Sequence, residues 1–308
     1  MSKDIEDKLD QIPVINILVM LLRNVKLPGL EGMSLYDLLE IYIVGIANGT
    51  LTARASAIAF SFFMAIFPSL LFFLNLLPYV PIDNFQADFI ETITSFLPNE
   101  SGIFLNDIII DIVKNKHGGL LSSTFFLSIF LMTNGVGAMF TGFENSYHVH
   151  EKRSFFKQYV NALCIGLTLA LLLIFTIIVL GYLEIYTPLI SSSEQQANTG
   201  VSVKIIEYAF LICMIYIGTA ILYYFGTLQR KRAKFFSSGA LLTTVLIVLT
   251  SYLFGIYIAN FSQYNELYGS IGALLILMLY IWLNANILLL GFELNASIDM
   301  LKLKNETT

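Results

Sequence analysis

Six long runs of apolar residues divide the chain, and each is long enough to cross a membrane as a helix. The hydrocarbon core of a bilayer is about 30 Å thick, a distance that takes about 20 apolar residues at the rise of an α-helix. Lipid offers no partner for unpaired peptide groups, so uninterrupted runs of this kind predict helices. The predicted crossings are residues 55–77, 120–143, 159–183, 205–228, 237–261 and 269–292.

The six runs are almost free of charge. Five of them contain no Asp, Glu, Lys or Arg, and the fourth contains only Glu207, about one turn inside its outer end. Charged residues within membrane spans usually mark ion or proton pathways. Their scarcity here counts against a proton pump or a relay of carboxylates.

Two shorter segments near the N-terminus predict helices that lie on the membrane surface. Residues 12–22 are apolar but only about half as long as a span requires. In residues 35–47 apolar side chains recur at helical spacing, while Asp37 and Glu40 fall on the other side. We therefore expect N-terminal interfacial amphipathic helices that lead into the first crossing.

The distribution of Lys and Arg predicts the orientation. Alternate segments, beginning with the N-terminal one, hold fourteen of the seventeen basic residues. Basic residues accumulate on the cytoplasmic side of membrane proteins, so both termini are expected to be cytoplasmic. The predicted organisation is an all-α membrane protein with interfacial helices in 1–50, a six-helix domain in 51–300 with an outer loop at 78–119, and a cytoplasmic tail at 301–308.

Composition agrees with a membrane protein and argues against two other classes. Hydrophobic residues make up 56% of the chain and charged residues 13%, whereas soluble domains are about 25% charged. A soluble fold could not cover so much apolar surface. The net charge of −5 argues against a nucleic-acid partner, which would favour a concentrated basic face.

No group of residues in the sequence predicts catalysis. His117, His148 and His150 lie in loops without a metal-ligand pattern, and no phosphate-binding or dinucleotide-binding motif occurs. Cys164 and Cys213 lie inside apolar runs and are interpreted as buried thiols. We therefore predict no catalytic residue, no metal and no cofactor.

Charged residues at the helix ends form the first group of candidate site residues. Arg54 opens the first crossing, Glu144 closes the second, Glu293 follows the sixth, and Arg153 lies in the loop after Glu144. The predicted topology places all four on the cytoplasmic side. Either a structural ion pair of Arg54 with Glu293 or Glu144, or a cluster that faces a ligand, fits this pattern.

Polar side chains within the spans and one basic run form the second group. Asn134, Asn284, Asn286, Ser61 and Asn75 are candidates for a substrate path, although hydrogen bonds between helices are the commoner role of such residues. The basic run consists of Arg230, Lys231, Arg232 and Lys234. It sets the topology, and it could also hold anionic lipid headgroups.

The C-terminal stretch carries a family resemblance. The segments YGSIGA (268–273), YIW (280–282) and LGFELNA (290–296) are similar to the signature of the YihY/BrkB family of bacterial inner-membrane proteins. The similarity extends to residues 55–68 next to Arg54, to 144–147 followed by Arg153, and to 238–240. The resemblance implies a six-helix membrane fold and suggests links to the export of envelope lipids. The family's former ribonuclease label has no support in these residues.

Together these features lead us to expect a non-enzymatic protein of the bacterial cytoplasmic (inner) membrane. It would transport, or assist the transport of, a lipid or lipid-linked envelope component, with membrane lipids as partners. The alternative is a non-transporting scaffold for envelope-assembly enzymes. A lipid-filled lateral groove lined by Asn134 and Asn284 would favour transport over the scaffold.

Overall fold

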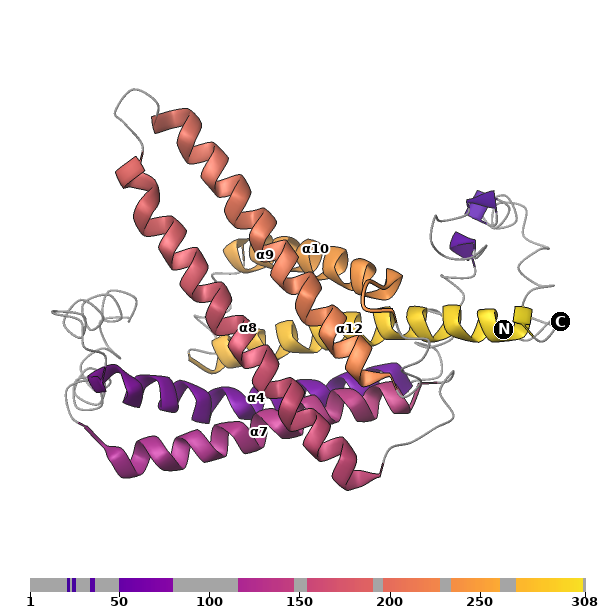
Figure 1. Cartoon of the computed structure of the whole chain (residues 1–308), viewed down its shortest axis with the longest axis horizontal. Coiled ribbons are helices and arrows are strands. Elements are labelled where there is room, and N and C mark those ends of the chain that lie inside the picture. The colour runs from indigo at the N-terminus through magenta and orange to yellow at the C-terminus, as the bar shows by residue number, and fades with distance from the viewer. Residues whose placement is uncertain are drawn as a thin grey trace. The chain divides into compact units, whose positions relative to one another are not determined.

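The computed structural model describes residues 21–22, 24–25, 34–36, 50–79, 116–146, 154–190, 196–227, 234–260 and 270–306. The elements within these ranges are helices (Figure 1). They are α4 (Thr50–Leu76), the 3-10 helix η1 (Leu77–Tyr79), α7 (Gly118–Glu144), α8 (Phe155–Ile190), α9 (Gln196–Gly226), α10 (Ser238–Asn260) and α12 (Ser270–Glu306).

Six of these helices are long and apolar enough to cross a membrane, which confirms the prediction of six spans. The candidate spans are Leu51–Leu76, Gly118–Glu144, Phe155–Leu183, Val203–Gly226, Ser238–Ile258 and Leu274–Asp299. The helices α8 and α9 continue beyond their spans, over 36 and 31 residues in total. Hydropathy thus finds the spans but not the full length of the helices.

Several predictions fall mostly outside the described residues. These are the N-terminal interfacial helices, of which only short pieces are described, and most of the outer loop at 78–119. The side chains of the tail at 301–308 also lie outside them. The orientation of the termini and the division into three regions remain predictions.

The chain forms two compact units. One contains Met1–Ala59 and Val136–Thr308, and the other contains Phe60–Gly135. The helices α4 and α7 each contribute one part to each unit. In the described part of the smaller unit, α4 and α7 pack antiparallel. The rings of Phe72 and Phe125 lie 5.3 Å apart, and a Cβ on Gly135 would lie 3.2 Å from the Phe62 ring.

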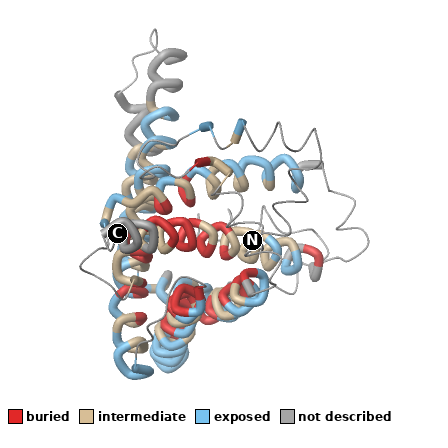
Figure 2. The backbone as a smooth tube through the Cα atoms, turned by 90° about the vertical axis from the view of Figure 1, so that its right-hand side faces the viewer, coloured by how far each residue is buried: buried red, intermediate tan, exposed pale blue. Residues whose placement is uncertain are grey.

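The larger unit has its core around the second half of α12. Buried positions there include Leu288, Leu289, Phe292 and Leu294. Elsewhere the spans are mostly intermediate or exposed in the single chain, and buried positions are confined to short stretches (Figure 2). Many of the buried positions of the larger unit are therefore in the second half of α12.

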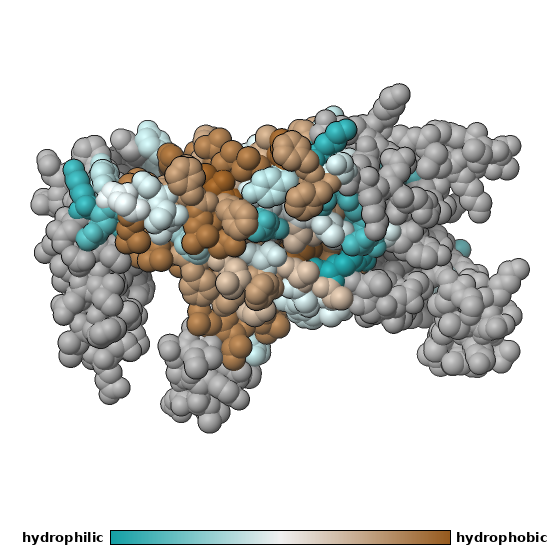
Figure 3. Space-filling view, turned by 90° about the horizontal axis from the view of Figure 1, so that it is seen from below, coloured by the Kyte–Doolittle hydropathy of each residue, from teal (hydrophilic) through white to brown (hydrophobic). Residues whose placement is uncertain are grey.

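Large apolar side chains cover much of the described surface (Figure 3). Such a surface is unusual for a soluble monomer and suits contact with lipid. Cys164 and Cys213 are also exposed, so their interpretation as buried thiols is wrong. A membrane helix is apolar around its whole circumference, and its sequence therefore does not reveal which side is buried.

Candidate functional site

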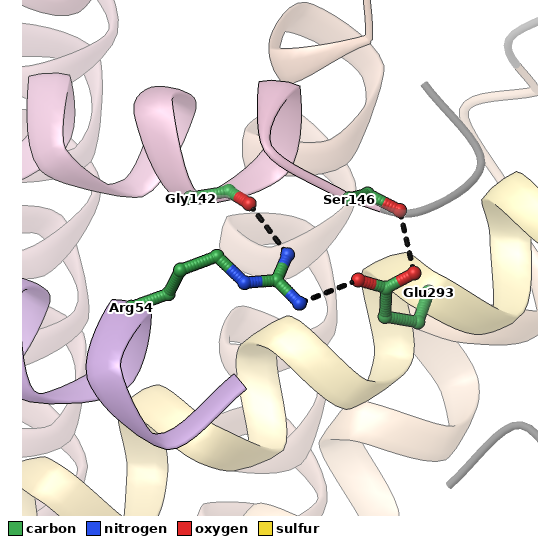
Figure 4. Close-up of polar contacts among 4 residues, drawn as sticks. All are labelled: Arg54, Gly142, Ser146 and Glu293. Carbon is green, nitrogen blue, oxygen red and sulfur yellow. Dashed lines mark hydrogen bonds and ion pairs between the residues drawn. The ribbon is translucent and has the colours of Figure 1, made fainter. Parts of the chain in front are cut away.

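Arg54 lies at the start of α4 and joins two other helices of the larger unit. Its Nη2 donates to Glu293 Oε1 of α12 at 2.8 Å. Its Nη1 donates to the carbonyl oxygen of Gly142, near the end of α7, also at 2.8 Å (Figure 4). The two charged side chains are only 10% and 8% exposed. The ion pair is therefore largely removed from solvent.

The end of α7 explains why a cation is stabilising at this point. The Ser146 N–H donates to Phe143 rather than to Gly142, so the Gly142 carbonyl lacks the bond that would continue the helix. Terminal carbonyls carry the negative end of the helix dipole, and basic side chains stabilise them. Arg54 supplies both a hydrogen bond and a positive charge there.

Glu293 uses both of its oxygens. While Oε1 accepts from Arg54, Oε2 accepts from the Ser146 hydroxyl at 2.5 Å. Removing either partner would leave a buried charge with fewer compensating contacts, which is strongly destabilising. The arrangement of Arg54, Gly142, Ser146 and Glu293 thus ties the start of α4 and the end of α7 to α12.

The other charged candidates differ in what the structure shows. Glu144 is the last residue of α7 and is buried, at 6% exposed, in the same unit. Arg153 lies outside the described residues. Arg54 forms an ion pair with Glu293, one of the two partners expected from the sequence, and both charged groups engage protein partners.

An aromatic cluster lies beside this ion pair. The rings of Phe143 and Phe292 stack with centroids 4.2 Å apart. Tyr223 of α9 packs edge-on against Phe143 at 5.7 Å, and its hydroxyl donates to the Leu288 carbonyl at 2.7 Å. The same hydroxyl contacts Thr243 Oγ1 of α10. Tyr223 therefore connects its own helix, α9, to α7, α10 and α12.

The helices α10 and α12 approach each other closely at two glycines. A Cβ on Gly291 would overlap Thr243 Oγ1 and lie 2.6 Å from the Tyr223 hydroxyl. A Cβ on Gly239 would overlap the Gly291 carbonyl and lie 2.6 Å from Asn295 Cγ. Neither position has room for a side chain, so glycine is required at both for this packing.

Asn295 caps the N-terminus of α10 from a neighbouring helix. Its Oδ1 accepts from the Gly239 N–H at 2.8 Å, and its Nδ2 donates to Ser237 Oγ at 2.9 Å. Ser237 Oγ accepts in turn from the Ala240 N–H at 3.2 Å. The first N–H groups of a helix need such partners.

The LGFELNA segment is thus a junction of helices. Gly291 admits α10, Phe292 stacks on α7, Glu293 binds Arg54 of α4, and Asn295 caps α10. Of these residues only Glu293 was among the sequence candidates. An isolated glycine within a helical run signals a packing constraint and could have drawn attention to Gly291. Nothing in the pattern identifies its partner Thr243.

The polar candidates of the larger unit bond mainly to their own helix. Asn284 Nδ2 donates to the Tyr280 carbonyl and Asn286 Nδ2 to the Trp282 carbonyl, both at 2.8 Å. Both side chains are of intermediate exposure. Tyr280 bonds Ser251 of α10, so Asn284, one turn later, falls on the side of α12 that faces α10.

The polar candidates of the smaller unit differ sharply in exposure. Asn75 is 1% exposed, its Nδ2 donates to the Leu71 carbonyl, and its Oδ1 has no hydrogen-bond partner within the described structure. Ser61 is of intermediate exposure. Asn134 is exposed on α7. Because Asn134 and Asn284 belong to different units, a groove lined by both remains a prediction.

The remaining candidates are the four residues of the basic run. Lys234 is exposed, whereas Arg230, Lys231 and Arg232 lie outside the described residues. Among the described residues, no three or more His, Cys, Asp or Glu side chains are grouped to hold a metal ion.

Comparison with known proteins places this architecture in a family. The chain is 28% identical to the ribonuclease-like protein YfkH of Bacillus subtilis (strain 168) over 79% of its own length and 88% of that protein. It is 23% identical to a UPF0761 membrane protein of Psychrobacter sp. (strain PRwf-1), over 80% of its own length but only 45% of that protein. A UPF0761 membrane protein of Xanthomonas oryzae pv. oryzae is 38% identical over 68 residues, which are 22% of this chain and 16% of that protein.

No solved structure matches the chain. The family model described as Virulence factor BrkB matches residues 43–307, a range that contains all six candidate spans and the LGFELNA junction. This match confirms the resemblance seen in the sequence, and the protein belongs to the BrkB family of membrane proteins.

Proposed function

We propose that this protein transports, or assists the transport of, a lipid or lipid-linked envelope component across the bacterial cytoplasmic membrane, without a catalytic role. In this proposal both termini are cytoplasmic. The observation that carries it is the position of Asn134, a polar side chain exposed within an apolar span.

In this proposal Asn134 lies well inside the membrane. It is ten residues before Glu144, the end of its span, which is about 15 Å along the helix. Its neighbours Phe130 and Leu127 are exposed apolar side chains. An amide in hydrocarbon without a partner is costly, about 4–8 kcal/mol on an alkane scale. A polar ligand or water that reaches this depth would remove the penalty.

The amide offers chemistry that suits a lipid headgroup. Asparagine presents two donors and one acceptor, so it can bind phosphate or hydroxyl groups without adding charge to the span. The nearly uncharged spans favour a cargo whose passage needs no fixed counter-charge. A lipid headgroup that moves past such an amide, with its acyl chains in the surrounding bilayer, satisfies both conditions.

The experiment is lipid translocation in vesicles. The purified full chain is reconstituted with a phospholipid that carries a nitrobenzoxadiazole label on its headgroup, and dithionite then bleaches only the label in the outer leaflet. The proposal predicts that dithionite bleaches more label than the outer leaflet holds, either in the absence of a membrane potential or after one is imposed. Protein-free vesicles and vesicles with an unrelated six-span protein are the controls. Bleaching limited to the outer leaflet under every condition would instead favour a non-transporting scaffold.

A further inference from the structure

Two segments of the chain repeat one combination of residues at the start of a helix: the first runs into α8, whose first residues are Phe155, Phe156 and Lys157, and the second ends two residues before α10 begins at Ser238. Residues 152–157 read Lys-Arg-Ser-Phe-Phe-Lys and lead into α8, and residues 231–236 read Lys-Arg-Ala-Lys-Phe-Phe and lead into α10. Each joins basic residues to a pair of phenylalanines. We call them the first and second basic-Phe-Phe segments.

Three of the four phenylalanines in these segments are exceptionally exposed, whereas Phe235 is of intermediate exposure. Phe155 is 83% exposed, Phe156 74% and Phe236 73%, the three highest values among the large apolar side chains that the structure describes. Lys157 and Lys234, next to them, are exposed as well. Exposed aromatic rings beside a lysine are typical of the membrane interface, where the ring enters lipid and the ammonium stays with the headgroups.

With α8 and α9 as membrane crossings, the start of α8 and the start of α10 lie on the same face of the membrane. The helices α8 and α9 cross between the start of α8 and the start of α10, and two crossings return the chain to the side from which it began. Lys204 lies near the other end of α9 and is also exposed. It therefore marks the opposite face.

Contacts of the second segment place its rings along the wall of α9. The ring of Phe236 stacks on Tyr216 with centroids 6.0 Å apart and planes inclined by 15°. The ring of Phe235 meets Tyr224 edge-on at 6.1 Å. Tyr216 is ten residues before the end of α9, so Phe236 extends back along the helix toward the membrane interior. Lys234 directly precedes these two phenylalanines in the sequence and is exposed.

We propose that the two basic-Phe-Phe segments bind anionic phospholipid headgroups of the leaflet that they face. Lys157 and Lys234, with their basic neighbours in sequence, attract the phosphate, and the phenylalanines insert beside the acyl chains. A basic residue near an anionic membrane surface contributes about 1 kcal/mol. The negative charge of such a headgroup complements these segments. The inference is independent of transport and requires only that α8 and α9 cross the membrane.

The test uses tryptophan reporters within the segments. Trp282 is the only tryptophan, so Phe156→Trp and Phe236→Trp are made separately in a Trp282→Phe background. Each is reconstituted in mixed vesicles of phosphatidylglycerol and phosphatidylcholine. In one preparation the phosphatidylglycerol is brominated, and in the other the phosphatidylcholine is brominated. Quenching gives the relative affinity for the anionic lipid, and thermal unfolding shows that each variant is folded.

The proposal predicts stronger quenching by brominated phosphatidylglycerol than by brominated phosphatidylcholine at both reporters. Lys157→Gln should lower this preference about fivefold at residue 156, and Lys234→Gln should do so at residue 236. The matched control Lys204→Gln should change neither. The preference should weaken with added salt, and inorganic phosphate at the same ionic strength should have no further effect. Equal quenching by both lipids in folded reporters, or an equal response to Lys204→Gln, would overturn the proposal.

Discussion

Arg54 and Glu293 are 239 positions apart in the sequence, yet Nη2 of the arginine lies 2.8 Å from Oε1 of the glutamate. This pair joins the beginning of the first described span to the end of the last one. The arginine also binds the last turn of α7, and the glutamate binds Ser146. Because both side chains bond to other groups of the protein, the pair stabilises the packing of α4 and α7 on α12.

The pair should therefore be energetically coupled. Arg54→Met or Glu293→Gln alone should lower the free energy of unfolding by about 3–5 kcal/mol, because each leaves a buried charge without its partner. The double variant should lose clearly less than the sum of the two, as measured by thermal or denaturant unfolding in detergent. A cycle of Arg54→Met with Glu207→Gln, an acidic residue within α9, is the control. Additive effects of the two substitutions on the free energy of unfolding would contradict a direct interaction between Arg54 and Glu293.

Gly291 tests the approach of α10 to α12. Gly291→Ala places a methyl group against Thr243 and Tyr223, where the structure has no space. Overpacking of this kind costs about 1–3 kcal/mol or more, so we expect a lower unfolding temperature and less folded protein after purification. Gly255→Ala in α10 is the matched control, since its Cβ meets nothing within 4 Å. It should be neutral or stabilising, because alanine favours a helix. Similar melting of the two variants would refute the close approach.

Asn295 tests the cap that α12 supplies to α10. Asn295→Ala removes the acceptor for the Gly239 N–H and should cost about 1 kcal/mol, in the range of an N-cap substitution. Asn295→Asp keeps this acceptor but loses the donor to Ser237, so its melting temperature should lie between wild type and Asn295→Ala. Asn286→Ala, whose amide bonds only its own helix, should change stability less. Stability of Asn295→Ala equal to wild type would exclude the cap.

Topology is checked by labelling single cysteines in a variant that lacks Cys164 and Cys213. The excess of basic residues in alternate segments predicts that cysteines at Gln86, Gln195 and Gln263 react with an impermeant reagent from outside intact cells. Cysteines at Gln158 and Lys302 should react only after the membrane is opened. Labelling of Lys302 from outside in intact cells would contradict cytoplasmic termini.

Sequence reasoning found the spans because lipid imposes a simple rule on length and polarity. It also singled out Arg54 and Glu293, since charges at the ends of neutral helices stand out. It did not show which side of each helix is buried. Cys164 and Cys213 lie in runs that are apolar all around, and the sequence does not distinguish a lipid-facing side from a packed one.

The junction within α12 was beyond prediction for a related reason. Gly291 and Asn295 matter because of Thr243, Tyr223 and Gly239, which come from other helices. Contacts between helices in a membrane depend on small residues and shape, not on a hydrophobic stripe. Their partners become identifiable only once the helices are placed together.

Asn134 provides the most direct measurement of the proposed transport. Because its side chain is exposed on an apolar span, Asn134→Leu should not lower the free energy of unfolding, since leucine removes an amide that is costly to expose to hydrocarbon. In the vesicle assay the same variant should lose translocation of the labelled phospholipid, whereas Asn134→Gln, which keeps the amide, should retain most of it. An Asn134→Leu protein that is stable and translocates lipid at the wild-type rate would contradict a role for this amide in transport.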